Sequence, residues 1–173
     1  MKFRSVLIFP NFNSGDQAII QSIRQKNDSL YAHIRPHVSL VFPFQSNASD
    51  TIICDAVQSV VKQFESFTLT LNHVEGDTDN GYVWLSVAQG ADIIKMIHDK
   101  LYELYNFKPF YRRDIPYQPH VTIGQSLHPN EARQLVKTLN ESQWYITAKI
   151  ECVAIENILA NDDSEILASF ELV

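Results

Sequence analysis

Two short segments of this sequence place a histidine and a hydroxyl side chain two residues apart within one shared pattern. Residues 36–40 read Pro-His-Val-Ser-Leu, and residues 119–123 read Pro-His-Val-Thr-Ile. On a β-strand, residues i and i+2 share a face, so each segment presents its imidazole and hydroxyl together while the aliphatic residues face the core. Two imidazoles can act as base and acid near neutral pH, and hydroxyls can hold phosphate oxygens. The pair therefore favours acid–base catalysis at a phosphodiester.

The paired segments resemble the two H-x-[ST]-hydrophobic motifs of the two-histidine (2H) phosphoesterase superfamily, which includes the 2′-5′ RNA ligase-like proteins and the cyclic nucleotide phosphodiesterases. The resemblance implies a bilobal fold with one motif in each lobe. It also implies metal-independent hydrolysis or transesterification of a 2′,3′-cyclic or 2′-5′ phosphodiester, with His37 and His120 as acid and base and with Ser39 and Thr122 on the phosphate. The first motif has Ser where many members have Thr, which keeps the hydroxyl.

Aromatic and arginine side chains precede both motifs and are candidates for substrate binding. Arg35, Tyr117 and Arg112 are the residues that we select. Aromatic rings can stack on a base, and a guanidinium can pair with a phosphate of a mononucleotide or a single strand. The alternative is that the aromatic residues fill an interface between the lobes while the arginines face solvent, with Arg113 paired to Asp114.

The other histidines are interpreted as structural residues, and no cofactor is expected. His98 falls on the polar side of a predicted helix, His128 precedes Pro129 at a helix start, and His73 lies in a predicted strand. His33 is near enough in sequence to the first motif to approach the site. No carboxylate or thiolate joins the two motif histidines in sequence, so the pattern does not predict a metal site.

Hydrophobic periodicity predicts the elements that must position these residues. Apolar residues at helical spacing predict one helix that begins near residue 14, helices over 52–64 and 93–105, and a helix that begins at residue 129. Alternating or short apolar runs predict strands at 5–9, 38–44, 67–74, 82–88, from 120 onward, at 147–158 and at 165–172.

An internal repeat relates the two halves of the chain. An offset of 83 residues maps three segments onto later ones: 36–40 onto 119–123, 67–74 onto 150–157 and 82–87 onto 165–170. Two copies are too few for a solenoid, which needs at least about three. We therefore predict an α+β fold of the bilobal α/β kind, formed by residues 1–173 as a single domain. Its two pseudo-twofold-related lobes would line a central cleft with antiparallel-rich sheets and carry the helices outside.

Composition and charge exclude several classes of protein. With 173 residues, of which 45% are hydrophobic, the chain suits one globular domain rather than a disordered or fibrous protein. It has no apolar run near the roughly 18 to 20 residues of a membrane span, and we expect a cytoplasmic protein that does not bind membranes. Cys54 and Cys152 lie inside apolar patterns and are expected to be buried thiols.

The formal net charge of −6 is distributed unevenly along the chain. Residues 1–113 carry 11 basic and 11 acidic residues, whereas residues 114–173 carry 3 and 9. A protein that binds duplex nucleic acid needs many phosphate-neutralising cations, and this chain has no basic stripe. We therefore predict a monomer that acts on a small nucleotide or RNA-end phosphodiester and does not bind duplexes.

Three other functions remain open at this point. The same cleft could hold a nucleotide without turning it over, in which case the ligand would survive long incubation. The protein could have an RNA ligase-like processing role in which the reverse reaction matters. A structural or interaction module would instead place the two histidines far apart or bury them without a cleft.

Overall fold

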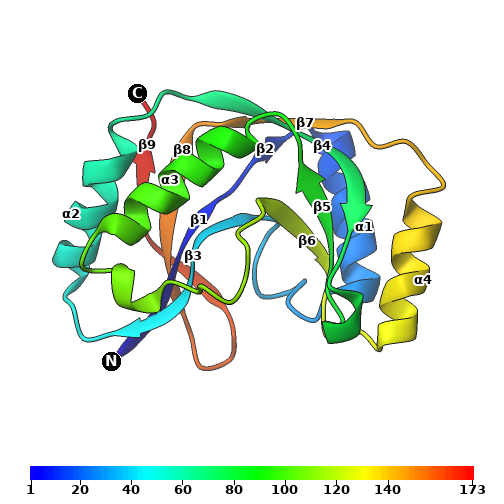
Figure 1. Ribbon diagram of the computed structural model, residues 1–173, viewed down its shortest axis with the longest axis horizontal. Coiled ribbons are helices and arrows are strands. Elements are labelled where there is room, and N and C mark those ends of the chain that lie inside the picture. The colour runs from blue at the N-terminus through cyan, green and yellow to red at the C-terminus, as the bar shows by residue number, and fades with distance from the viewer.

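Two antiparallel β-sheets form the centre of the molecule (Figure 1). The computed structural model describes residues 1–173. One sheet has the strand order β3-β1-β8-β9, and the other has the order β2-β7-β4-β5-β6. The strands are β1 Lys2–Ile8, β2 Asn11–Phe12, β3 Val38–Ser46, β4 Phe67–Glu75, β5 Val83–Val87, β6 His120–Gly124, β7 Ile146–Ile150, β8 Cys152–Ile158 and β9 Ser164–Glu171.

Four α-helices cover the sheets on their outer faces (Figure 1). They are α1 Ser14–Asn27, α2 Asp50–Val61, α3 Ala91–Glu103 and α4 Pro129–Leu139, and two short 3-10 helices span Thr78–Asn80 and Lys108–Phe110. Helix α3 contacts β3 and α2 contacts β9 in the four-stranded sheet, whereas α1 contacts β6 and α4 contacts β4 and β5 in the five-stranded sheet. None of the helices is long and apolar enough to span a membrane.

Side chains at the helix starts explain where the helices begin. The Asn13 side chain accepts a hydrogen bond from the Asp16 backbone, and the Ser49 side chain accepts one from Ile52. His128 forms a capping box with Glu131, which confirms its predicted role at a helix start. These side chains satisfy backbone N–H groups that the first helical turn leaves without partners.

The two sheets are tied together by chain crossings. The chain leaves β1 in the four-stranded sheet and enters the five-stranded sheet at β2, which α1 follows, and α3 follows β5 of the five-stranded sheet but packs on β3 of the four-stranded sheet. The predicted strand over 147–158 is wrong as a single element, because the chain passes from one sheet to the other at Glu151. Its first part is β7 in the five-stranded sheet, and its second part is β8 in the four-stranded sheet. Each lobe is therefore completed by segments from both halves of the sequence.

The predicted repeat holds for two of its three segments. The motif strands β3 and β6 are edge strands, and counting inward from them gives β1 and then β8 in one sheet, and β5 and then β4 in the other. The segments 67–74 and 150–157 thus occupy equivalent places. The segments 82–87 and 165–170 do not, since β5 lies beside its motif strand and β9 lies at the far edge. The strand beside β3 is the N-terminal strand β1, which corresponds to β5 beside β6. The offset of 83 residues cannot reveal this correspondence, because it relates the segment of β5 to that of β9 instead.

A buried ion pair fastens the segment that leads to the first motif. The side chains of Arg24 and Asp28 are 1% and 2% exposed, and the Arg24 Nε donates to Asp28 Oδ2 at 2.6 Å. The Arg24 Nη2 also donates to the carbonyl oxygen of Ile34 at 2.8 Å, while Asp28 Oδ1 accepts from the backbone N–H of Leu30 at 2.9 Å. The end of α1 therefore holds the backbone just before His37.

The two cysteines are free thiols, each half-buried rather than fully buried as expected from the sequence. Burial raises the pKa of both Cys54 and Cys152.

Removing the carboxylate of the buried pair is expected to destabilise the fold strongly. The Asp28→Asn variant leaves the Arg24 guanidinium buried without a counter-ion, which costs about 3–5 kcal/mol of unfolding free energy. Urea unfolding followed by circular dichroism measures this loss. The matched control is Asp79→Asn, which breaks the exposed pair with Arg133 and should leave the unfolding midpoint nearly unchanged. Equal midpoints for the two variants would contradict this account of the pair.

Candidate functional site

The two motif histidines lie at the starts of strands whose core faces are buried as predicted. His37 immediately precedes β3, and His120 is the first residue of β6. The aliphatic partners in the motifs, Val38, Leu40, Val121 and Ile123, are at most 1% exposed. The residues on the other face of each strand are half-buried: His37 and Ser39 in the first motif, and His120 and Thr122 in the second. Strands β3 and β6 contact each other, so the lobes bring the two motifs together.

Each motif histidine forms the same hydrogen bond to the backbone. His37 Nδ1 lies 3.0 Å from the carbonyl oxygen of Arg35, and His120 Nδ1 lies 2.7 Å from that of Gln118. A carbonyl oxygen only accepts, so Nδ1 must carry the proton in both rings. The proline before each histidine keeps the preceding residue out of the helical region, so the carbonyl lies in an extended segment. The neutral rings therefore present an unprotonated Nε2 for chemistry.

Burial lowers the pKa of both imidazoles. Desolvation is the largest cause for His120, where the neighbouring His37 lowers the pKa further and brings it to about 4. Desolvation is also the largest cause for His37, and the hydrogen bond to Arg35 and the carboxylate of Glu156 oppose it. Both rings are thus neutral at neutral pH in the free protein. An anion bound between them would raise both pKa values, because it stabilises the charged imidazolium.

The surroundings of the two rings differ. The Trp84 ring stacks on His120 with centroids 4.7 Å apart and planes at 30°. Glu75 accepts hydrogen bonds from Ser86 and Gln118, so a carboxylate supports the residue whose carbonyl orients His120. The motif pattern alone does not point to these residues, although Trp84 lies directly opposite Thr122 once β5 and β6 are paired.

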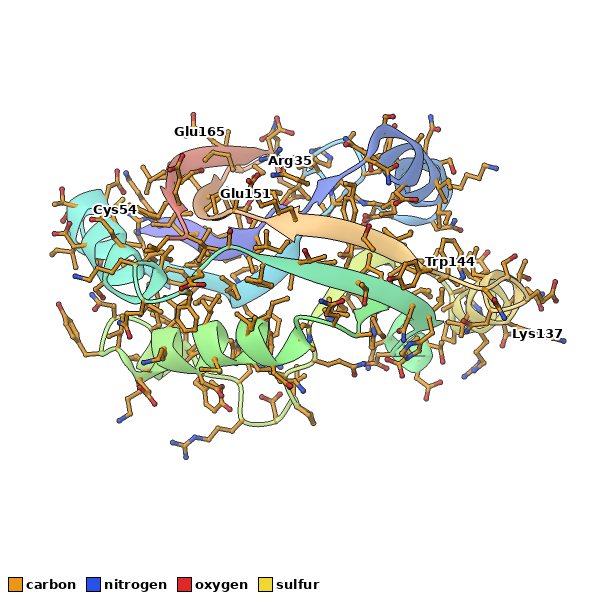
Figure 2. The ribbon with its side chains drawn as sticks, turned by 90° about the horizontal axis from the view of Figure 1, so that it is seen from above. Arg35, Cys54, Lys137, Trp144, Glu151 and Glu165 are labelled. Carbon is orange, nitrogen blue, oxygen red and sulfur yellow. The ribbon has the colours of Figure 1, made fainter.

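The first motif has a different set of neighbours. The rings of Phe9 and His37 meet edge-on, with their centroids 6.2 Å apart. The guanidinium carbon of Arg35 lies 4.0 Å from the centroid of the Phe9 ring. Arg35 is exposed, and seen from above it lies between the ribbons of α1 and β9 (Figure 2). Its guanidinium is not used in an ion pair, so it is available to an anionic ligand beside His37.

The other two residues selected for substrate binding are engaged by the protein itself. The Tyr117 hydroxyl donates to the carbonyl oxygen of Ser39 at 2.8 Å. Arg112 forms two hydrogen bonds to Asp114, at 2.9 and 2.7 Å, so Asp114 pairs with Arg112 and not with Arg113, the alternative partner considered from the sequence. Contacts of Tyr117 and Arg112 with a substrate stay predictions.

His98 is buried, contrary to its expected place on a polar helix face. It is 1% exposed, its Nδ1 lies 2.7 Å from the carbonyl oxygen of Leu40, and its ring stacks on Tyr117 with centroids 3.5 Å apart. The aromatic segment before the second motif folds over α3 and covers this face. His33 pairs with Asp163, and His73 pairs with Glu75, both with partial exposure.

A cavity of about 180 Å³ opens beside the first motif, with His37 and Ser39 in its wall. A larger hollow of about 410 Å³ lies over α3 and the 108–113 segment, lined by Asp99, Glu103, Lys108 and Arg113 among others. It contains no motif residue and mixes both signs of charge, so we place the functional site at the smaller cavity. No group of three or more His, Cys, Asp or Glu side chains is arranged to hold a metal ion.

Known proteins share sequence similarity with this chain. The model of the 2′-5′ RNA ligase superfamily matches residues 12–161. A protein of Geobacillus thermodenitrificans named "Putative phosphoesterase" is 30% identical over 142 residues, covering 73% of this chain and 70% of the relative. A protein of the same description from Bacillus licheniformis is 26% identical over 141 residues, covering 80% of this chain and 79% of the relative.

Solved structures share the fold. Escherichia coli LigT complexed with 3′-AMP has a TM-score of 0.68 at 15% identity, with 99% of this chain and 98% of LigT covered. TT0787 of Thermus thermophilus also has a TM-score of 0.68, at 11% identity and with the same coverage. LigT has further been crystallised with ATP and with NADP+. The predicted α+β fold with two antiparallel sheets is thereby confirmed.

Nitrogen chemical shifts can test the hydrogen bonds of the motif histidines. Long-range ¹H–¹⁵N NMR spectra should show the Nδ1–H tautomer for His37 and His120, with the titration midpoint of His120 near the lowered pKa of about 4. His128 is an internal control, because its Nδ1 accepts from the backbone N–H of Asn130 and its ring must therefore be the Nε2–H tautomer. Inorganic phosphate should raise both motif pKa values. A His120 midpoint at or above about 6.5 would show that the ring is not desolvated.

Proposed function

The chain belongs to the 2′-5′ RNA ligase superfamily, and on this premise we propose that it is a phosphoesterase that cleaves a 2′,3′-cyclic or 2′-5′ phosphodiester of a nucleotide or RNA end. The observation that carries the proposal is the matched pair of imidazoles, each with Nδ1 bound to a backbone carbonyl and each two residues from a hydroxyl on a strand of its own lobe. In-line displacement at phosphorus needs a base and an acid on opposite sides of the phosphate, and two facing lobes supply both.

The proposed reaction uses only groups of this chain and water. One imidazole takes a proton from the attacking water as its oxygen bonds to phosphorus. The bond from phosphorus to the 2′ or 3′ oxygen then breaks, and the second imidazole, which is protonated once the anion is bound, gives its proton to the leaving oxygen. The hydroxyls of Ser39 and Thr122 hold the non-bridging oxygens as charge develops, and Arg35 contributes a positive charge beside them.

A small nucleotide is the ligand that we propose for this cleft. The crystal structures of LigT with 3′-AMP, ATP and NADP+ support this choice, because they place small nucleotides on the same fold. The chain lacks the clustered basic residues that duplex binding needs, in keeping with its net charge of −6. The metal-free mechanism, the monomeric state and the cytoplasmic location remain predictions.

Replacing either motif histidine is expected to lower turnover strongly. His37→Gln and His120→Gln should each lower kcat by about 10²- to 10⁴-fold, because each removes one proton transfer. The measurement is ³¹P NMR of a panel of 2′,3′-cyclic nucleotides and 2′-5′-linked dinucleotides in excess EDTA. The matched control, His128→Gln, alters only a helix cap and should keep wild-type turnover.

The products separate the proposal from its rivals. A single 2′- or 3′-monophosphate from the wild type shows which ester bond is cut. A nucleotide that binds but is unchanged after long incubation identifies a binding protein instead. Wild-type turnover in both motif variants would show that the assigned roles are wrong.

The lowered pKa values predict an acid-shifted activity profile. The base must be neutral and the acid protonated, so kcat/KM falls below the lower pKa and above the higher pKa of the free protein. Both values lie below the ordinary value of about 6.5. We therefore expect kcat/KM to peak below about pH 6.5 and to fall as pH rises through neutrality. The assay is the rate of cyclic nucleotide hydrolysis at low substrate between about pH 4 and pH 9, and a peak above about pH 7.5 would contradict the predicted desolvation.

A further inference from the structure

The cavity beside His37 extends away from the second motif to a buried carboxylate. His37 and Ser39 line one part of it, and Ser5 of β1, Glu156 of β8 and Ser164 of β9 line another. Its volume of about 180 Å³ is below the roughly 300–1,000 Å³ of sites that enclose a whole drug-sized ligand. It has room for one flat ring system attached to a group outside it.

The polar side chains at the Glu156 end of this cavity can only accept hydrogen bonds from a ligand. Glu156 is 4% exposed, and its two carboxylate oxygens accept from the hydroxyls of Ser5, at 2.6 Å, and Ser164. Those hydroxyl protons are used, so the lone pairs left on the carboxylate and on the hydroxyl oxygens are acceptors. Asp162 adds a second carboxylate at the rim, and no lysine or arginine lines the cavity. A phosphate would be repelled at this carboxylate end, whereas a neutral group rich in N–H donors would be bound there.

The position of the carboxylate suits the far end of a nucleotide. Ser39 pairs with Leu7 across β3 and β1, and Glu156 pairs with Ser5 across β8 and β1. Ser5 and Leu7 are two residues apart, so the carboxylate side of the cavity lies about 7 Å along the strand from the hydroxyl that we place on the phosphate. Side chains of Leu7, Leu30 and Ile34 provide apolar walls between the two ends. The occupant is thus anionic at one end and a flat N–H donor at the other.

We propose that this cavity is a nucleobase subsite in which Glu156 accepts hydrogen bonds from the Watson–Crick edge of the base. Guanine presents two neighbouring donors, N1–H and the N2 amino group, which match the two oxygens of a carboxylate. Uracil presents a single N–H between two carbonyl oxygens, which the carboxylate repels. The inference rests on the proposed function in one respect, since it takes the phosphate to lie at His37 and Ser39.

Equilibrium binding of mononucleotides tests the subsite without any need for turnover. Isothermal titration calorimetry with 3′-GMP, 3′-AMP, 3′-CMP and 3′-UMP should show that the wild type binds 3′-GMP about 5- to 100-fold more tightly than 3′-UMP. Glu156→Gln should bring this ratio close to one, because the amide replaces one acceptor by a donor that faces the base amino group. The matched control is Glu165→Gln on the exposed start of β9 (Figure 2), which makes the same change outside the cavity and should keep the ratio.

A further variant keeps the test decisive if Glu156→Gln folds poorly. Leu30→Trp leaves the carboxylate unchanged but fills the cavity, so it should remove the preference for 3′-GMP. Equal affinities of the wild type for all four nucleotides would overturn the subsite. So would a Glu156→Gln variant with a lowered Tm and an unchanged ratio, because Glu156 would then only join β1, β8 and β9.

The two proposals fail in different ways. If cyclic nucleotides and 2′-5′ dinucleotides are not cleaved but the base preference exists and depends on Glu156, the subsite stands and the proposed reaction does not. If all four 2′,3′-cyclic nucleotides are hydrolysed with the same kcat/KM in the wild type and in Glu156→Gln, the reaction stands and the subsite is refuted.

Discussion

The contact between two edge strands, β3 and β6, brings the two histidine motifs of this molecule together. Each is the outermost strand of its own sheet and carries one motif at its start. The two strands belong to separate sheets, so the motif residues at their starts are not covered by a further strand. An edge strand normally exposes backbone groups that can pair with another chain. In this molecule the two edge strands contact each other beside the motifs, while the inner strands pair within each sheet.

Side chains take over part of the pairing that a neighbouring strand would provide for β3. The hydroxyl of Tyr117 donates to the carbonyl oxygen of Ser39, the ring of His98 binds that of Leu40, and the hydroxyl of Tyr102 accepts from the N–H of Phe42 at 3.1 Å. These side chains come from α3 and from the segment that leads to the second motif. The second half of the chain thus holds the strand of the first motif in position. This arrangement explains why Tyr117 is half-buried against the protein rather than displayed to solvent.

Local patterns account for what the sequence could predict. Alternation along a strand depends on neighbouring residues only, so the core positions of Val38 and Val121 could be predicted without knowing the fold. Trp84 and Glu156 could not be assigned to the site in this way, because each acquires its role from the strand beside it. Trp84 lies opposite Thr122, and Glu156 lies opposite Ser5, which is 151 residues away in sequence. The break at Glu151 could not be predicted for the same reason. The residues on both sides of it have strand patterns, and only the sheet to which each strand belongs is different.

Strand β1 pairs with β3 on one side and with β8 on the other, so the first lobe needs both ends of the chain. As the protein is synthesised, β1 and β3 emerge early and can pair at once, whereas β8 and β9 are made only after every strand of the five-stranded sheet. Contacts between distant segments form slowly because a long loop must first be closed. The four-stranded sheet, whose strands β1 and β3 are made early, is therefore completed after the five-stranded sheet. Until the C-terminal hairpin arrives, the nascent chain carries an open strand edge that is vulnerable to pairing with other chains on the ribosome.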